Sequence, residues 1–218
     1  MRTLALVPVQ RLSLAKSRLA GRLGPEARDE LMRRLLARLL GELRCAQRVE
    51  HVQVVSPDPA VLALAAEAGA SPLPQVESGL NAAVELGQRA ALAEGWARLL
   101  VVLADLPLLV AEQVDRMLAL AHPGRVVIAP DRHGLGTNLL ALWPPDALAP
   151  LFGQSSRQRH ARAARERGLR VVEYWSIGTA NDLDTPEDLD ELERRWGWTV
   201  ASWIVGEGVS EWRSGTAR

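Results

Sequence analysis

The chain has 218 residues, of which 48% are hydrophobic and 24% charged, the composition of a globular protein that buries most of its unfolded surface in one main domain. Lys+Arg and Asp+Glu both number 26, so the formal net charge is zero and bulk charge favours neither nucleic acid nor a membrane surface as a partner. No run approaches the ~20 apolar residues of a membrane span, and the residues before Pro8 are too weakly apolar for a secretory leader. We therefore expect a cytoplasmic protein with no nucleic-acid or membrane partner.

Predicted strands and helices alternate along the chain. Residues 3–9 and 99–104 are apolar runs that predict buried strands, and a leucine stripe at i, i+4 spacing predicts a helix over 26–44. Strands that alternate with helices form a parallel sheet with right-handed crossovers. The sequence therefore predicts an α/β fold with a mostly parallel sheet, with further strands at 52–55, 71–74, 125–129, 138–143 and 169–175, and further helices at 59–68, 80–94, 111–121, 156–167 and from Thr185 onward.

The alternation stops at Trp196, and residues 196–218 contain four of the seven tryptophans. A packed tryptophan buries on the order of 150–250 Å². We therefore expect residues 1–195 to form the main domain, and residues 196–218 to form an arm that docks on it or on a second subunit of a homodimer. Cys45, the single cysteine, has no disulfide partner and is predicted to be a small buried side chain of the leucine-rich helix.

Two acidic positions carry the strongest functional signal. Asp105 ends the buried strand at 99–104, and ligands of parallel sheets sit beyond the carboxyl ends of the strands. The alternative is a turn former or helix cap. In the later segment Thr185 and Asp188 are explained as a helix cap, whereas Asp182 and Asp184 share one face of an extended segment. Two carboxylates at one edge suggest a divalent metal.

The loop after the first strand contains Lys16, the only lysine in the chain, and Arg18. Both can neutralise a triphosphate, although a solvated loop explains them equally well. The loop has neither the dinucleotide-binding glycine pattern nor a P-loop, which disfavours dehydrogenases and P-loop kinases. Gly79 and Asn81 begin a predicted helix, where Asn81 can contact a base or cap the helix.

Two loops rich in Gly, Ser and Thr follow Asp105 in the sequence. Residues 131–138 and 152–156 offer backbone N–H groups and hydroxyls, from which anion sites are built. Their neighbouring cations are Arg132, Arg157 and Arg159. The pair of loops predicts a small anionic substrate.

The segments PVQ…AKSRL, GLN, LADLPLL, APDRHGLGTN, FGQSS and LDTPEDL occur in the order found in the 2-phospho-L-lactate/phosphoenolpyruvate guanylyltransferases, which the chain resembles over residues 4–192. The resemblance implies a three-layer α/β/α sheet fold of the nucleotide-diphospho-sugar transferase (GT-A) type, with residues 1–195 as its catalytic domain. It also implies GTP as co-substrate, Mg²⁺ as cofactor and a role in coenzyme F-420 biosynthesis.

The same resemblance implies the roles of individual residues. Asp105 and Asp184 would bind the metal, and Lys16 and Arg18 would bind the triphosphate. The expected catalytic residues are Lys16, Arg18 and Asp105. The base would contact Gly79 and Asn81, and the phosphorylated three-carbon acid would contact Thr137, Gly153 and Ser156.

The expected reaction is transfer of GMP from GTP to the phosphate of this acid, with phosphoenolpyruvate preferred over 2-phospho-L-lactate. Its nucleophile is already anionic, so no general base is required and the histidines have no assigned part. Two alternatives stay open at this point. One is a nucleotidyltransferase of the same fold that acts on a sugar or pterin phosphate, and the other is a non-catalytic nucleotide-binding homologue.

Overall fold

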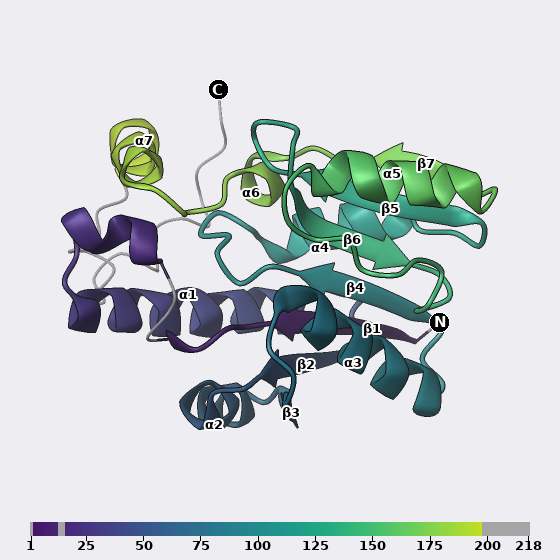
Figure 1. The fold of residues 1–218 in the computed structure, drawn as a ribbon, viewed down its shortest axis with the longest axis horizontal. Helices are drawn as coiled ribbons and strands as arrows, with labels where there is room; N and C mark the ends of the chain where they lie inside the picture. The colour runs from purple at the N-terminus through teal and green to yellow at the C-terminus, as the bar shows by residue number, and fades with distance from the viewer. Residues whose placement is uncertain (1, 13–15, 198–218) are drawn as a thin grey trace.

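The protein is described here by a computed structural model that covers residues 2–12 and 16–197. Its centre is one seven-stranded sheet, in the order β3-β2-β1-β4-β6-β5-β7 (Figure 1). The strands are β1 (Thr3–Pro8), β2 (His51–Ser56), β3 (Ser71–Pro74), β4 (Arg98–Val102), β5 (Arg125–Pro130), β6 (Thr137–Leu142) and β7 (Arg170–Glu173). The helices are α1 (Pro25–Cys45), α2 (Pro59–Glu67), α3 (Leu80–Ala93), α4 (Ala111–Leu120), α5 (Ser156–Glu166), α6 (Ile177–Ala180), α7 (Pro186–Trp196) and the 3-10 helix η2 (Ser17–Gly21).

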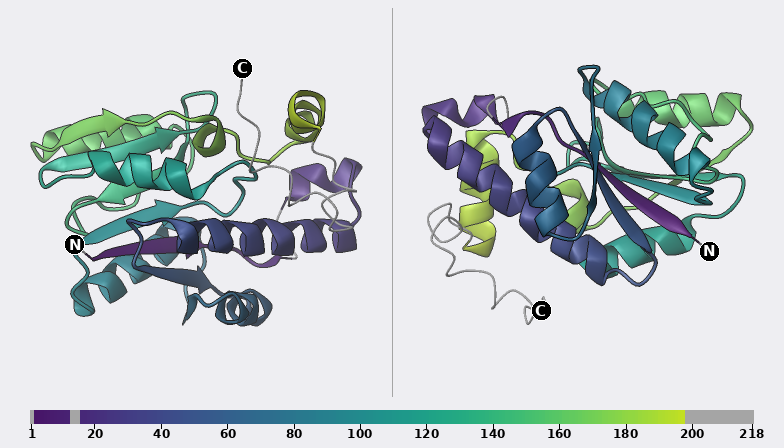
Figure 2. Two further views of the ribbon diagram at one scale, coloured as in Figure 1. Left: turned by 180° about the vertical axis from the view of Figure 1, so that it is seen from behind. Right: turned by 90° about the horizontal axis from the view of Figure 1, so that it is seen from below.

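Helices cover both faces of the sheet, which gives the predicted three layers (Figure 2). Successive residues of a strand point to opposite faces, and β1 divides accordingly. Ala5 and Val7 pack in the core that includes α1, α2 and α4, whereas Leu4 and Leu6 pack in the core that includes α3 and α5. Because β1 is buried on both faces, its sequence is an uninterrupted apolar run rather than an alternating one.

β6 is the exception to the parallel arrangement, since it pairs antiparallel with both β4 and β5. Val102 at the end of β4 lies opposite Leu139. Thr137, the first residue of β6, therefore lies at the edge of the sheet where β4 ends. Through this reversal, the loop after β4 and the loop before β6 meet at one place.

Three details differ from the sequence predictions. Cys45 is exposed, so its predicted burial is wrong. It lies two residues beyond Leu43, and a helix turns by roughly 200° over two residues, which carries Cys45 off the buried stripe. Neither η2 nor α6 was predicted, because helices of four or five residues are too short to show a period.

The predicted Trp-rich arm lies almost wholly outside the described residues, including Trp198, Trp203 and Trp212. Trp196 is the last residue of α7 and is partly buried against the core. Within residues 2–12 and 16–197, no helix combines the length and the apolar content needed to cross a membrane.

Gly87 lets α3 pack closely on β1. A Cβ atom at this position would lie 2.2 Å from a terminal methyl carbon of Leu6, which is fully buried. Overpacking a core costs about 1–3 kcal/mol, whereas Gly→Ala in an open helical position gains about 1 kcal/mol. We predict that Gly87→Ala is less stable than Gly41→Ala, its matched control in α1, where a Cβ meets nothing within 4 Å. Urea denaturation measures both, and equal stabilities would contradict the close packing.

Candidate active site

Three carboxylates lie together beyond the end of β4. The carbonyl oxygen of Asp105 accepts a hydrogen bond from the backbone N–H of Leu183 at 2.9 Å. Leu183 is fully buried, and so it anchors the two acidic residues on either side of it, Asp182 and Asp184. This hydrogen bond brings the loop after β4 and the segment before α7, which are far apart in the sequence, to one edge of the sheet.

The start of α7 fixes the backbone of Asp184. Asp188 Oδ2 accepts hydrogen bonds from the backbone N–H of Asp184 at 2.8 Å and of Thr185 at 2.7 Å. Thr185 Oγ1 accepts in return from the Asp188 N–H at 3.4 Å, and Pro186 is the first helical residue. The predicted helix cap is confirmed. Asp188 therefore has a structural role, whereas the Asp184 side chain takes no part in the cap.

Lys16 lies between two of the carboxylates. Its Nζ donates to Asp105 Oδ2 and to Asp184 Oδ1, each at 2.7 Å, and its side chain is only 4% exposed. Lys16 has the left-handed backbone conformation, φ 53° and ψ 36°, just before η2. This conformation is rare for residues other than glycine. The first loop is thus built to present one ammonium group to the carboxylates.

The charged side chains of this group shift the pKa values of one another. Burial alone would lower the pKa of Lys16, but Asp105 and Asp184 outweigh it, and the pKa is raised above its usual value. Burial would raise the pKa of Asp184, yet Lys16 and Arg18 hold it low. Burial, reinforced by the charge of Asp105, raises the pKa of Asp182 to about 6. The site contains more negative charge than Lys16 alone can balance.

The arrangement fits a hard cation. Asp105 Oδ1 is buried and has no hydrogen-bond partner among the described residues, a costly state that a cation would relieve. Mg²⁺ prefers oxygen ligands and needs only one or two carboxylates, because phosphate and water complete its shell. In the described part of the chain, no group of three or more His, Cys, Asp or Glu side chains is arranged as a closed metal cage. The carboxylates therefore fit a cation that arrives with phosphate.

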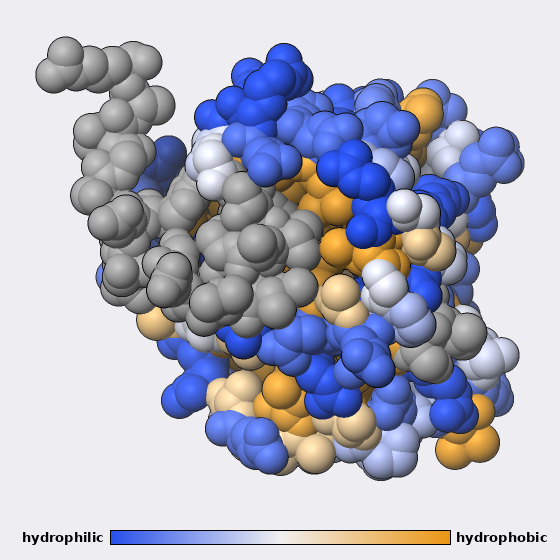
Figure 3. Space-filling view, turned by 90° about the vertical axis from the view of Figure 1, so that its left-hand side faces the viewer, coloured by the Kyte–Doolittle hydropathy of each residue, from blue (hydrophilic) through white to orange (hydrophobic). Residues whose placement is uncertain are grey.

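Arg18 lies on the solvent-exposed side of the carboxylates, next to Asp184. Its guanidinium is 4.0 Å from Asp184 Oδ2 and its side chain is 73% exposed. Figure 3 faces the end of the molecule that carries η2 and α7, where polar residues, in blue, surround a smaller apolar area, in orange. Arg18 is therefore free to turn toward an anion that approaches from solvent.

The residues expected to bind the acid come together beside β6. Thr137 Oγ1 lies 3.1 Å from Nδ1 of His160, which is one helical turn beyond Ser156 on α5. The backbone N–H of Arg157 also donates to the Leu135 carbonyl at 3.1 Å, which ties the loop before β6 to the start of α5. Thr137 and Ser156 are both about 2% exposed. The two predicted loops thus form one structural unit.

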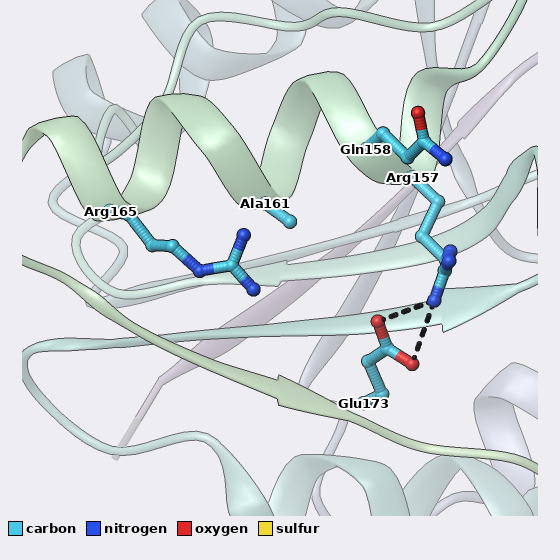
Figure 4. A pocket seen from close by; sticks show the side chains of 5 residues that line it. All are labelled: Arg157, Gln158, Ala161, Arg165 and Glu173. Atoms are coloured by element: carbon cyan, nitrogen blue, oxygen red, sulfur yellow. Dashed lines mark hydrogen bonds and ion pairs between the residues drawn. The ribbon is translucent and has the colours of Figure 1, made fainter.

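Two of the arginines expected beside these loops are engaged elsewhere. Arg132 pairs with Asp188 and with Glu191 of α7. Arg157 pairs with Glu173 of β7 at 2.9 Å, beside a hollow between α5 and β7 (Figure 4). Arg159 is different: it is exposed, and its guanidinium lies 3.9 Å from where a Cβ on Gly153 would be. Within residues 2–12 and 16–197, Arg159 is therefore the one of these three arginines without an ion pair.

In the 131–138 loop, two backbone N–H groups donate hydrogen bonds to a side chain of the same loop. The carboxylate of Asp131 accepts from the backbone N–H of Leu135 at 2.9 Å and of Gly136 at 2.8 Å. These two donors are therefore not available to an anion, contrary to the prediction for this loop. The last two residues of the segment keep side-chain contacts in the site, Thr137 with His160 and Asn138 with Asp182.

Asn81 lies where α3 meets the unit formed by the loops at 131–138 and 152–156. Its Oδ1 accepts from the backbone N–H of Phe152 at 2.8 Å, and its Nδ2 donates to the Phe152 carbonyl at 3.2 Å. Gly79, two residues earlier, has φ 108° and precedes α3 without a side-chain cap. The amide of Asn81 thus links the start of α3 to the loop before α5. Its role in binding the base stays a prediction.

Sequence reasoning missed two residues that organise the site. Asn138 Nδ2 donates to the Thr179 carbonyl at 3.0 Å and to Asp182 Oδ1 at 3.3 Å. His160 is fully buried and contacts Thr137. The i, i+4 spacing of Ser156 and His160 was the available signal for the histidine. No local signal exists for Asn138, because its partners come from the segment around α6.

Comparison with known proteins gives one consistent answer. Residues 3–194 match the family model described as "Guanylyl transferase CofC like". The phosphoenolpyruvate guanylyltransferase of Sphaerobacter thermophilus is 50% identical over 192 residues, which cover 88% of this chain and 93% of the relative. The 2-phospho-L-lactate guanylyltransferase of Methanothermobacter thermautotrophicus is 38% identical over 193 residues, or 88% of this chain and 84% of that one.

A solved structure confirms the type of fold. A Desulfovibrio desulfuricans protein assigned to the nucleotide-diphospho-sugar transferases superposes with a TM-score of 0.75 at 20% identity, over 99% of this chain and 92% of that protein. The predicted GT-A type sheet fold is therefore confirmed. With the family model matched over nearly the whole described chain, the protein belongs to the CofC-like guanylyltransferase family.

Proposed function

We propose that this chain transfers GMP from GTP to the phosphate of a phosphorylated three-carbon acid, with phosphoenolpyruvate preferred and Mg²⁺ as cofactor, in the biosynthesis of coenzyme F-420. Its family and the name of the Sphaerobacter thermophilus relative support the reaction and the acid. The name of the Methanothermobacter thermautotrophicus relative makes 2-phospho-L-lactate the second candidate.

One observation carries the proposal: two neighbouring residues of β6 contact the two parts of the site, the carboxylates and the unit expected to bind the acid. Asn138 contacts Asp182 in the carboxylate group. Thr137 contacts His160 in the unit expected to bind the acid. A nucleotide held at the carboxylates and an acid held at Thr137 and Ser156 would be adjacent, and adjacency is the main requirement for a reaction between two anions.

The chemistry needs no base from the protein. A phosphate oxygen of the acid forms a bond to the α-phosphorus of GTP, while the bond from that phosphorus to the bridging oxygen of the β-phosphate breaks and pyrophosphate leaves. Mg²⁺ held by Asp105 and Asp184 would supply positive charge to the triphosphate. Once these carboxylates are satisfied, the ammonium of Lys16 is available to the triphosphate, and Arg18 adds a second cation at the entrance.

The two alternatives are now less well supported. A nucleotidyltransferase for sugar or pterin phosphates would share the fold, but the family match over residues 3–194 is to guanylyltransferases. A non-catalytic homologue has no need to retain Asp105, Asp184 and Lys16, yet the three are in direct contact here.

The first prediction for the reaction concerns Asp105. Asp105→Asn should lower kcat/KM by on the order of a hundredfold or more, because a metal anchor contributes several kcal/mol to the transition state. Asp190→Asn is the matched control, since Asp190 is 57% exposed and, in the described part of the chain, its one ion pair is with Arg22 on the surface. Pyrophosphate release at saturating Mg²⁺ measures both. Near-normal turnover of Asp105→Asn in a folded protein would refute the assignment.

The second prediction concerns the acid. Phosphoenolpyruvate and 2-phospho-L-lactate differ at the carbon that bears the phosphate, which is planar in one and tetrahedral in the other. Contacts to one such group contribute about 1–3 kcal/mol, so we expect a preference for phosphoenolpyruvate of roughly 10- to 200-fold in kcat/KM. The comparison uses the same GTP and Mg²⁺, with 3-phosphoglycerate as a third acid. If phosphoenolpyruvate is the poorest of the three, this choice of acid is wrong although the guanylyl transfer stands.

A further inference from the structure

His160 is a fully buried histidine that the proposed reaction does not use. It extends from α5 between the two segments that carry the acid-binding residues. Its Nε2 lies 2.9 Å from the backbone nitrogen of Leu151, and its Nδ1 lies 3.1 Å from Thr137 Oγ1. The ring of Phe152 packs edge-on against it, with the centroids 5.0 Å apart. Both ring nitrogens are thus occupied by groups of the site.

These contacts determine which nitrogen carries the proton. A backbone N–H can only donate, so the N–H of Leu151 requires an unprotonated Nε2 on His160. Burial, assisted by the charge of Arg159, lowers the pKa of His160 to about 4, so the ring is neutral at pH 7. The one ring proton is therefore on Nδ1, and Nδ1–H donates to Thr137 Oγ1.

The consequence is a directed hydroxyl. Because Thr137 Oγ1 accepts from His160, its own proton has to be donated elsewhere. Within the described residues, the hydrogen bond to His160 is the one found for this hydroxyl. Thr137 begins β6, next to Asn138, at the edge of the sheet that holds the carboxylates. Its O–H is therefore a spare donor at the place where an anionic substrate is expected.

We propose that His160 is a positioning residue for the acid substrate: it holds the Thr137 hydroxyl as a donor toward the anion and fixes the loop at Leu151 that leads to Gly153. The inference rests on the proposed function, in which Thr137, Gly153 and Ser156 bind the acid. It adds the reason why the threonine binds an anion rather than a group that donates a hydrogen bond. His160 itself does not contact the substrate.

Two substitutions separate the two contacts of His160. In His160→Gln the side-chain oxygen can take the place of Nε2 and accept from Leu151, while the donor to Thr137 is lost. In His160→Asn the amide nitrogen can take the place of Nδ1 and donate to Thr137, while the acceptor for Leu151 is lost. His122→Gln is the matched control, because His122 is exposed.

We expect His160→Gln to raise the KM for the acid at least tenfold, with the KM for GTP changed less than twofold, because its Thr137 hydroxyl is no longer committed to the substrate. His160→Asn should retain most of the affinity for the acid while its melting temperature falls. A purely structural role predicts instead that the KM for the acid follows the melting temperature in both variants, and that result would overturn the proposal.

A second measurement stands even if neither variant folds. Two-bond ¹H–¹⁵N correlation spectra of the unmodified protein at pH 7 identify the protonated nitrogen of each histidine ring, and the ring of His160 is recognised by its nuclear Overhauser effects to Phe152, the one phenylalanine of the sequence. We expect Nδ1–H. A proton on Nε2 would overturn the proposal. If the tautomer is Nδ1–H but no phosphorylated acid is consumed, the proposed function fails and the hydrogen-bond assignment stands.

Discussion

The site depends on one interaction, the ammonium of Lys16 held at 2.7 Å from both Asp105 and Asp184. Carboxylates brought this close repel one another, and burial makes each charge more costly. When no ligand is bound, the positive charge of Lys16 offsets that cost. Lys16 adopts a left-handed backbone conformation to reach the carboxylates, and this conformation is locally strained. The carboxylates are therefore kept assembled before any substrate arrives, so the binding of nucleotide does not have to gather them.

The second constraint is the reversed strand. β6 runs antiparallel to β4 and delivers Thr137 and Asn138 to the edge where β4 ends. From the other side, α6 packs against the loop after Asp105 so closely that a Cβ on Gly178 would lie 2.4 Å from the Leu108 carbonyl oxygen. The Thr179 carbonyl of α6 then accepts from Asn138. One strand and one short helix thus join the carboxylates to the unit that is proposed to bind the acid.

Most of the fold was predictable, since every strand and every helix longer than five residues follows from apolar periodicity, Pro and cap signals. The antiparallel direction of β6 could not be predicted, because the sequence of a single strand does not indicate in which direction it pairs with its neighbours. Of the site, Asp105, Asp184 and Lys16 were named from the sequence and lie in contact. The burial of Cys45 was mispredicted, because its neighbours in the helix are buried leucines whereas Cys45 itself lies off the buried stripe. His160 and Asn138 were missed, because their roles come from tertiary partners.

In the proposed reaction, Lys16 and a divalent cation would occupy the same carboxylates, Asp105 and Asp184, in turn. Titration of the protein with Mn²⁺ in the absence of nucleotide, followed by the EPR signal of free Mn²⁺, tests it directly for the natural chain and for Lys16→Met. Two positive charges about 4 Å apart repel by several kcal/mol at the effective dielectric of a protein surface, so removing the ammonium should tighten Mn²⁺ binding at least tenfold. Equal or weaker binding by Lys16→Met would contradict the account.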